Sequence, residues 1–505
     1  MFYNDFDNPE KNSIIDLEKY KEICKVCDEI LLSPEANEVT VAIPILHVIR
    51  EHPVFLKQYQ NLFTSTKIKK SNLIYTDSIK KITKFLISSL LKSFNFKNFW
   101  HSTNNLKKKY DYIFVSHLLN EKQAGNNEDF YFGEIPTLLN NQGKTVLIVL
   151  INHTAVSNEL LYNKWNKNDI TRVLLSPQIG LFNEIQGCLK IFKEFSRLNS
   201  LKQNNILGKK IISLATSQFL QTLNNYRLSK QFMWLAKKTR PNNIVTTFEG
   251  HAWERIVFSS VKKIVPNIKC IGYQHALIFK EQHSIKRILQ KKYNPDLILT
   301  SGYLGKKQLD IWNKALNIDI KVLGTNRLPK NSNNENCNTN KFKETTILVI
   351  PEAIFSECIL LFEYSISCAL MYPNLKFIWR LHPLLKFDQI FNKNEGLAIR
   401  PNNIILSKQT LEADIYVSNY VLYRGSTAVI NCVLSGLKPI YLQINNEMTI
   451  DPLYEIDSYK FIVTKPDDLI LTQLNKESKN EEAEKYNLLN HCNKLMVPFD
   501  FKILL

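Results

Sequence analysis

The chain has 505 residues, too many for one ordinary hydrophobic core, so two or three domains are expected. Hydrophobic residues make up 44% and charged residues 22%, which is an ordinary globular composition, and no run of eighteen apolar residues predicts a transmembrane helix. The net charge of +18 favours anionic partners such as phosphate-bearing substrates, an anionic membrane face or nucleic acid.

Residues 1–110 are predicted to form a partly helical, basic N-terminal region, with a strand at VTVAIP (39–44). The N-terminus lacks the basic-then-apolar pattern of a signal peptide, so a cytoplasmic protein is expected. The segment 77–109 is helical, basic and aromatic. It is either a core-facing helix with a solvated lysine face or a helix that lies on the inner face of an anionic membrane.

Between residues 111 and 330, short apolar runs alternate with longer helical patterns such as 208–238 and 252–264. This βα repetition predicts a first Rossmann-like domain, which would bind the acceptor. Several runs are apolar on both faces, as strands of a covered parallel sheet are. The predicted strands are YIFVS (112–116), TVLIVLI (145–151), TRVLL (171–175), NIVTTF (243–248), IKCIGY (268–273) and DLILTS (296–301).

The polar, aperiodic segment 331–345 is predicted to be a linker or long loop, and βα alternation then resumes over 346–505. The predicted fold class is α/β: two Rossmann-like domains that face each other across a cleft, with an additional N-terminal helical region. Ligands of such sheets bind beyond the carboxyl ends of the strands, so residues just after strands are the best site candidates. The strands predicted here are TILVI (346–350), LKFIWRL (375–381), NIILS (403–407), DIYVS (414–418) and KPIYL (438–442).

The sequence TFEGHAWER follows the predicted strand 243–248, and Gly250 permits a sharp turn before a helix. Glu249 would point into the cleft as a general base that takes a proton from a sugar hydroxyl. The alternative is a glutamate that interacts with the helix dipole. His251 and Glu254 are candidate substrate contacts, although Glu254 also fits a structural ion pair with Arg255 beside it.

The sequence IGYQHALI places Tyr273, Gln274 and His275 after the next predicted strand. A polar, aromatic loop at a strand end suits contacts with a sugar or a base. The alternative is a buried histidine whose hydrogen bonds are satisfied within the protein.

In the second half, WRLHPLL places Arg380, His382 and Pro383 at the end of the strand 375–381. An imidazole there can donate a hydrogen bond to a phosphate oxygen, and the proline rigidifies the loop.

The sequence YRGSTAVINCVLSGLKPIYL places Gly425, Ser426 and Thr427 between a strand end and a helix. Backbone N–H groups, the helix dipole and two hydroxyls would together form a phosphate cradle. The alternative is an ordinary helix N-cap, where serine and threonine are common.

The HP dipeptide at 382–383 and the later GST at 425–427 resemble the C-terminal half of GT-B glycosyltransferases, especially bacterial polysialyltransferases and Kdo transferases. These families use CMP-activated acidic sugars, and the resemblance implies that the HP histidine and the hydroxyl pair bind the donor phosphate. Here Ser-Thr replaces the usual serine pair. Polysialyltransferases also have an acidic-acidic-glycine motif that supplies the base, of which Glu249-Gly250 matches the last two positions.

The order EGHAWER, GYQHA, Pro351-Glu352, RLHP and GST also resembles a group of surface-carbohydrate biosynthesis proteins. The two resemblances together span about residues 240–445. They imply that Glu352, Arg380 and Gly425 belong to the nucleotide site as well.

The sequence therefore predicts a metal-independent GT-B glycosyltransferase that transfers Kdo or a nonulosonic acid from a CMP donor to a glycan or lipid-linked acceptor. No cofactor is expected. The one DxD, at Asp5–Asp7, lies outside any strand end, and the CxxC of Cys24 and Cys27 lacks partners for a zinc site. Dispersed lysines argue against nucleic-acid binding. The alternatives are a UDP-dependent sugar-nucleotide epimerase of the same fold and a non-catalytic member of a polysaccharide assembly complex.

Overall fold

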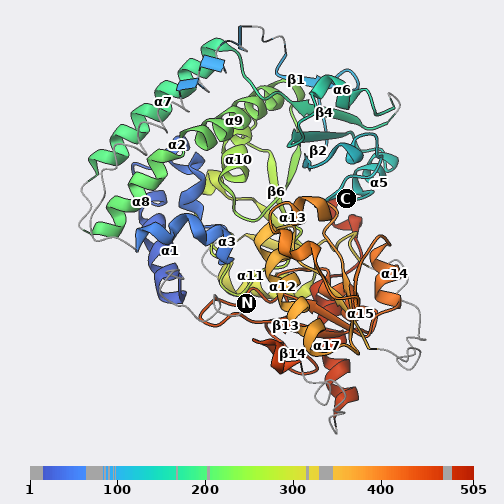
Figure 1. The fold of residues 1–505 in the computed structure, drawn as a ribbon. Coiled ribbons are helices and arrows are strands. Elements are labelled where there is room, and N and C mark those ends of the chain that lie inside the picture. The colour runs from blue at the N-terminus through green and yellow to red at the C-terminus, as the bar shows by residue number, and fades with distance from the viewer. Residues whose placement is uncertain are drawn as a thin grey trace.

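The computed structural model describes residues 15–63, 99–166, 169–201, 205–313, 318–328, 345–469 and 480–505, with isolated positions between 83 and 98. It contains two α/β domains and a layer of N-terminal helices beside the first of them (Figure 1). Asp5–Asp7, the predicted linker up to residue 344 and most of the basic segment before residue 99 lie outside the described residues. No helix in the described ranges is long and apolar enough to cross a membrane.

The first sheet has eight strands in the order β1-β4-β3-β2-β5-β6-β7-β8, all parallel except β1, which is antiparallel to β4. Its strands are apolar on both faces because helices cover both: Ile113 and Val115 pack into one cluster, and Phe114 into the cluster on the other face. The strands are β1 (Trp100–Ser102), β2 (Tyr112–Leu118), β3 (Val146–Asn152), β4 (Thr171–Leu175), β5 (Asn243–Thr247), β6 (Lys269–Gln274), β7 (Leu297–Thr300) and β8 (Asp319–Val322).

The second sheet has six parallel strands in the order β11-β10-β9-β12-β13-β14. Numbered from β9, this is the strand order 3-2-1-4-5-6 of the Rossmann fold, and β4-β3-β2-β5-β6-β7 repeats that order in the first sheet. The strands are β9 (Thr346–Val349), β10 (Lys376–Trp379), β11 (Ile404–Leu406), β12 (Tyr420–Tyr423), β13 (Lys438–Leu442) and β14 (Phe461–Val463). The predicted GT-B-like class of two Rossmann-like domains is therefore confirmed.

The helices fall into three groups. The N-terminal layer has α1 (Leu17–Leu31), α2 (Glu38–Ala42) and α3 (Pro53–Leu56). The first domain has α5 (Ile135–Asn141), α6 (Asn158–Tyr162), α7 (Leu181–Ser200), α8 (Ile206–Ser217), α9 (Phe219–Thr239), α10 (Ala252–Ile264) and α11 (Tyr303–Trp312). The second has α12 (Phe355–Met371), α13 (Phe387–Phe391), α14 (Leu411–Tyr416), α15 (Val429–Leu434) and α17 (Glu481–Leu495).

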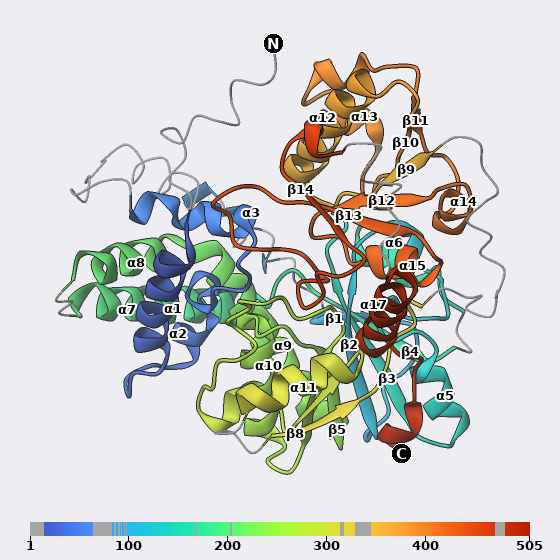
Figure 2. The same cartoon turned by 90° about the horizontal axis from the view of Figure 1, so that it is seen from below.

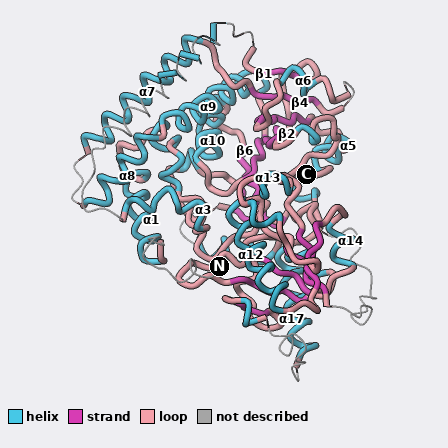
Figure 3. Tube along the Cα trace, in the orientation of Figure 1, coloured by secondary structure: helices cyan, strands magenta, loops and turns pink. Residues whose placement is uncertain are grey.

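The N-terminal helices share one hydrophobic cluster with the long helices α7, α8 and α9, so they form a helical layer on the flank of the first domain (Figure 3). Ile23 and Cys27 of α1 are buried there with Ile191 of α7 and Phe219 of α9. This packing brings the loop between α2 and α3, residues 48–52, to the residues that follow β5 and β9.

Two strands predicted from the sequence are helical in the structure. Residues 39–42 of the predicted strand 39–44 lie in helix α2 (Glu38–Ala42), because the Asn37 side chain accepts hydrogen bonds from the N–H groups of Val39 and Thr40 at 2.8 and 3.3 Å and starts a helix. Residues 414–418 end helix α14 instead of forming a strand, and β12 begins later. The helical stretch predicted over 208–238 is present as α8 and α9, which meet at Gln218, whose side-chain oxygen accepts a hydrogen bond from the Ile45 N–H at 2.8 Å.

The chain crosses between the domains twice. After α17 it returns to the first domain and ends beside α5 (Figure 2). The N–H of Thr325, on the outward crossing, donates to the carbonyl of Val497, on the return crossing, at 2.8 Å. The Asp500 N–H donates to the Leu323 carbonyl at 2.8 Å. The two crossings are therefore hydrogen-bonded to each other.

Candidate active site

The strand order of each sheet reverses at one place, between β2 and β5 in the first sheet and between β9 and β12 in the second. Open parallel sheets bind ligands at such switch points, beyond the carboxyl ends of the strands. At the first switch point β2 ends beside His117 and β5 leads into Glu249. At the second, β9 leads into Glu352, and β12 leads into Gly425. Glu249, Glu352 and Gly425 thus follow strands that flank the switch points, whereas the predicted residues around His275 and His382 follow the neighbouring strands β6 and β10.

Histidines gather at the first switch point. His117 Nε2 lies 3.3 Å from the Thr247 hydroxyl across the gap between β2 and β5, and its Nδ1 lies 2.9 Å from Nε2 of His153, at the end of β3. Burial and the neighbouring charges of His153 and His251 lower the pKa of His117 to about 3. His117 is therefore neutral at physiological pH and can donate or accept a hydrogen bond.

Glu249 is 7% exposed and is bound by a cation from the N-terminal region. Arg50 Nη2 lies 2.8 and 3.1 Å from its two carboxylate oxygens, and His251 Nε2 lies 3.5 Å away. Burial opposes ionisation, but the charge of Arg50, the hydrogen bond with His251 and the charge of His275 outweigh it and hold the pKa of Glu249 well below its ordinary value. Glu249 is therefore ionised, but its own affinity for a proton is low.

His251 shows the reverse effect. Burial favours its neutral form, yet the hydrogen bond with Glu249 and the charges of Glu254 and Glu249 raise its pKa above the ordinary value. Its side chain is 38% exposed, against 10% for that of Glu249. His251 is thus the more accessible member of the pair, and its proton affinity is the better matched to neutral pH.

The turn between β5 and α10 requires glycine at position 250. Gly250 has φ +87°, and a Cβ there would lie 2.4 Å from the carbonyl oxygen of Ser284. The carboxylate of Glu254 accepts hydrogen bonds from the N–H groups of Glu249, Gly250 and His251 at 3.1, 2.8 and 2.8 Å. Burial raises the pKa of Glu254 to about 7. Glu254 therefore fixes the loop that carries Glu249.

The ion pair considered for Glu254 and Arg255 is not present. Arg255 is buried, and its guanidinium donates to the Asn294 side chain at 2.8 Å and to the carbonyls of Ser284 and Arg287 at 2.7 and 2.9 Å. It therefore ties α10 to the loop 284–294 and not to the adjacent carboxylate.

The residues after β6 differ in exposure. Gln274 is 1% exposed, and its amide has no hydrogen-bond partner among the described residues. His275 is half-buried beside Tyr131, with ring centroids 4.6 Å apart. Burial and the charge of Arg327 lower the pKa of His275 to about 3. Tyr273 is buried and donates a hydrogen bond to the Gly324 carbonyl at 2.8 Å, which makes it structural.

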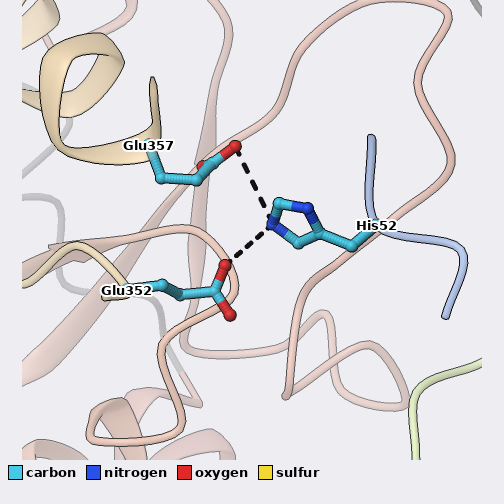
Figure 4. A group of neighbouring side chains, drawn as sticks. All are labelled: His52, Glu352 and Glu357. Atoms are coloured by element: carbon cyan, nitrogen blue, oxygen red, sulfur yellow. Dashed lines mark hydrogen bonds and ion pairs between the residues drawn. The ribbon is translucent and has the colours of Figure 1, made fainter. Parts of the chain in front are cut away.

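Glu352 lies at the second switch point and is reached from the N-terminal region. His52 Nε2 lies 2.8 Å from one carboxylate oxygen of Glu352 and 3.8 Å from Glu357 (Figure 4). A Cβ on Gly425 would lie 2.6 Å from the Glu352 carboxyl carbon. Glycine in the GST sequence therefore leaves room for this carboxylate beside the predicted phosphate cradle.

The ligand atoms of His52, Glu352 and Glu357 lie within 4.8 Å of one another, so a metal site must be considered. His52 Nδ1 accepts a hydrogen bond from the Val54 N–H at 3.1 Å, which leaves the proton on Nε2. A histidine ligand needs its lone pair on the metal-facing nitrogen and usually donates from the other one. The second carboxylate is held by Arg424 Nε at 2.7 Å. These residues fit a hydrogen-bonded network and do not fit a metal site.

His382, in the loop of the HP dipeptide 382–383, has a ring N–H that can donate a hydrogen bond. His382 Nδ1 accepts a hydrogen bond from the Leu384 N–H at 3.3 Å, which leaves Nε2–H as the donor. Burial and the charge of Arg327 lower the pKa of His382, so the ring is neutral. Arg380, in contrast, binds Asp414 at 2.7 Å and anchors α14, while Pro383 is exposed.

The remaining members of the GST sequence differ in role. Ser426 and Thr427 are half-buried one turn before α15. Arg424 is 2% exposed and lies between Glu357 and Glu447, with N–O distances of 2.7 Å to each. Arg424 is therefore part of the second domain's interior, and the two hydroxyls are the side chains that a ligand can reach.

Sequence reasoning missed five residues of this site: Arg50, His52, His117, His153 and Arg327. His117 and His153 end the predicted strands 112–116 and 145–151, so the strand-end rule could have found both. The segment containing Arg50 and His52 follows no strand. The sequence feature that could have indicated this segment is the charged run Arg-Glu-His within an otherwise apolar stretch.

No protein-family model matches the chain, and no curated protein matches it in sequence. Solved structures that resemble it include the calicheamicin glycosyltransferase CalG4, with 9% identity, a TM-score of 0.44 and coverage of 76% of this chain and 94% of that chain. MurG of Acinetobacter baumannii has 11% identity and a TM-score of 0.42, with 76% and 97% covered. UDP-GlcNAc 2-epimerase of Methanocaldococcus jannaschii, solved with UDP-GlcNAc and UDP, has 13% identity and a TM-score of 0.39, with 75% and 99% covered.

Proposed function

We propose that the protein is a metal-independent glycosyltransferase of the GT-B class. The observation that carries this proposal is the segment Arg50–His52, which binds Glu249 at one switch point and Glu352 at the other. This segment thereby connects the residues proposed to accept a proton with those proposed to bind the donor. Transfer of a sugar from a phosphate to a hydroxyl needs both.

The second domain supplies the donor site in this proposal. His382 Nε2–H and the hydroxyls of Ser426 and Thr427 donate to the phosphate, and Gly425 leaves room for the Glu352 carboxylate beside them. Glu352 accepts a hydrogen bond from a hydroxyl of the nucleotide. Neutral donors fixed before the reaction stabilise the charge that develops on the departing phosphate, which is where preorganised dipoles are most effective.

The first domain supplies the base. The acceptor oxygen forms a bond to the anomeric carbon, the bond from that carbon to the phosphate oxygen breaks, and the acceptor's proton moves to the Glu249–His251 pair. The imidazole of His251 receives the proton, and the carboxylate of Glu249 orients the ring and stabilises its charged form. Arg50 holds the carboxylate in place and keeps it ionised.

The donor is a CMP-activated acidic sugar, Kdo or a nonulosonic acid, and the reaction builds a surface polysaccharide at the cytoplasmic face of the membrane. The support is the similarity of the HP and GST sequences to enzymes of that kind. Thermal unfolding with CMP, UDP and GDP tests this, since a ligand stabilises the fold that it binds. CMP should raise the melting temperature most, equally with and without EDTA.

Each alternative has its own outcome in these assays. A preference for UDP together with isomerisation of a UDP-sugar without acceptor would establish the epimerase. Nucleotide binding without turnover over a broad acceptor set would establish a non-catalytic member of an assembly complex. Loss of the CMP effect in EDTA, restored by a divalent metal, would overturn metal independence.

A lipid-linked acceptor requires contact with the bilayer, and α7 offers a surface for it. Four exposed apolar side chains follow one another at helical spacing on this helix: Phe182, Ile185, Leu189 and Phe192. Lys190 and Lys193, also exposed, lie along one side of this stripe, as expected for a helix that rests on anionic lipid.

Flotation with phosphatidylglycerol vesicles tests the membrane contact. The protein should float with the vesicles, and the double variant L189S/F192S should lose most of this binding because about 0.8 kcal/mol is lost for each buried CH₂ removed. Leu370→Ser, an equally exposed leucine on α12, is the matched control and should float like the wild type. Unchanged flotation of the double variant would place the contact elsewhere.

A further inference from the structure

Arg327 lies on the outward crossing between the domains and touches both of them. Its backbone carbonyl accepts a hydrogen bond at 3.0 Å from the side chain of Asn431, in the first turn of α15. Its guanidinium lies over the rings of Phe130 and Tyr131 in the first domain, at 5.5 and 5.7 Å from their centroids. Arg327 therefore connects the first turn of α15, just after the GST sequence, with an aromatic pair of the first domain.

The charge of Arg327 acts, together with burial, on one imidazole in each domain. It contributes to the lowered pKa of His275 in the first domain and of His382 in the second. Both rings are accordingly neutral, and each can act as a hydrogen-bond donor to an anion placed between them and the guanidinium.

Three other arginines of the candidate site form ion pairs with carboxylates. Arg50 binds Glu249, Arg380 binds Asp414, and Arg424 lies between two glutamates. Within the part of the chain that the structure describes, Arg327 forms no ion pair and its guanidinium donates no hydrogen bond. Arg327 is half-buried, and the planar fork of donors of a guanidinium matches the oxygens of a phosphate.

We propose that Arg327 binds the phosphate of the nucleotide donor, together with the Nε2–H of His382. This inference rests on the proposed function and adds to it the charged group that neutralises the donor. The aromatic pair Phe130–Tyr131 orients the guanidinium, and Asn431 fixes its backbone relative to the hydroxyls of Ser426 and Thr427. Because the residue lies on the crossing, the phosphate contacts both domains through it.

The test compares each nucleotide with its nucleoside, which lacks the phosphate groups. Calorimetry measures CMP and cytidine, UDP and uridine, and inorganic pyrophosphate with the wild type, Arg327→Gln and Arg327→Lys. The nucleotide should bind more tightly than its nucleoside to the wild type, and Arg327→Gln should reduce this advantage roughly ten- to a hundredfold without weakening the nucleoside. Arg327→Lys should fall between the two because it keeps the charge without the fork.

The matched control is Arg400→Gln. Arg400 also lies over an aromatic ring, that of Phe391, but it precedes β11 and so lies at the opposite end of the strand from the cleft. It should keep the full phosphate advantage. A role of Arg327 in folding alone would weaken nucleoside and nucleotide equally, and that result would overturn the inference.

The outcomes also separate this inference from the proposed function. If Arg327→Gln keeps the full phosphate advantage while the wild type transfers sugar, the inference fails and the transferase stands. If the wild type binds no nucleotide but binds pyrophosphate in an Arg327-dependent way, the anion site stands and the transferase fails. Binding of none of these ligands by the wild type overturns both.

Discussion

The two sheets have the same strand order, but the loops at their switch points carry different chemistry. At the first, the strand ends bear His117, His153 and the Glu249–His251 pair, whose pKa values are displaced in both directions. At the second, they bear a glycine and two hydroxyls beside Glu352. Two sheets of the same strand order thus carry different side chains at their switch points, and the proposed function assigns proton transfer to the first and phosphate binding to the second.

The variant expected to have the largest effect is Glu249→Gln, which tests the proton-accepting role proposed for the first switch point. The amide keeps the shape but cannot stabilise a protonated His251, so turnover should fall by about 10² to 10⁴-fold, the usual contribution of a general base. Nucleotide affinity should be unchanged, because the proposed donor site lies in the second domain. Transfer rate and calorimetric affinity are measured on the same preparation.

Glu254→Gln is the control for that variant. Glu254 binds three backbone N–H groups of the loop, so this change should lower the free energy of unfolding by about 1–3 kcal/mol while the folded protein keeps its turnover. If Glu254→Gln is inactive and Glu249→Gln retains most of its turnover, the base is Glu254. If both remain active, His275 becomes the next candidate.

The second domain is tested by His382→Ala and Ser426→Ala. Each removes a hydrogen bond to a charged group, worth about 1.5–3 kcal/mol, so donor affinity should fall roughly ten- to a hundredfold in an intact fold. Calorimetry with CMP measures the loss. Ser367→Ala, whose hydroxyl binds a carbonyl within α12, should bind CMP like the wild type. Unchanged affinity in both variants would move the donor site elsewhere.

The smallest expected effect is a shift in the pH dependence of the rate, which shows whether His251 or Glu249 accepts the proton. The neutral ring of His251 is the base, so the rate should fall as pH drops through its raised pKa. The charge of Arg50 lowers the pKa of His251, so Arg50→Gln should move this fall to higher pH. A wild-type rate that stays flat down to the lowered pKa of Glu249 would show that Glu249 alone is the base.

Much of the fold follows from local sequence. Strands such as β3 are apolar on both faces because helices cover both sides of the sheet, and that pattern is visible in VLIVL. Residues 39–44 were misread because valine and threonine favour strands, whereas the Asn37 cap and packing against α9 and α10 favour a helix. Tertiary packing decided between two local preferences of similar strength.

Only part of the candidate site could be predicted from the sequence. Glu249, His382 and the GST residues follow strands, and the switch-point rule locates them. The pairings of Arg50 with Glu249 and of His52 with Glu352 span 199 and 300 residues, so no local pattern encodes them. They depend on the packing of the N-terminal layer against α7, α8 and α9, which only the folded chain reveals.

The double crossing has a consequence for synthesis on the ribosome. The second domain is inserted between β8 and the segment 497–504, and this segment completes the first domain: Tyr112, in the middle of the first sheet, hydrogen-bonds the Leu504 carbonyl. The domain whose strands emerge first is therefore finished last. The second domain can close while the first still lacks this segment and exposes the apolar residues around Tyr112 and Phe132 that it covers. Nascent chains should be most prone to aggregate, and most in need of a chaperone, in the interval before residue 504 leaves the exit tunnel.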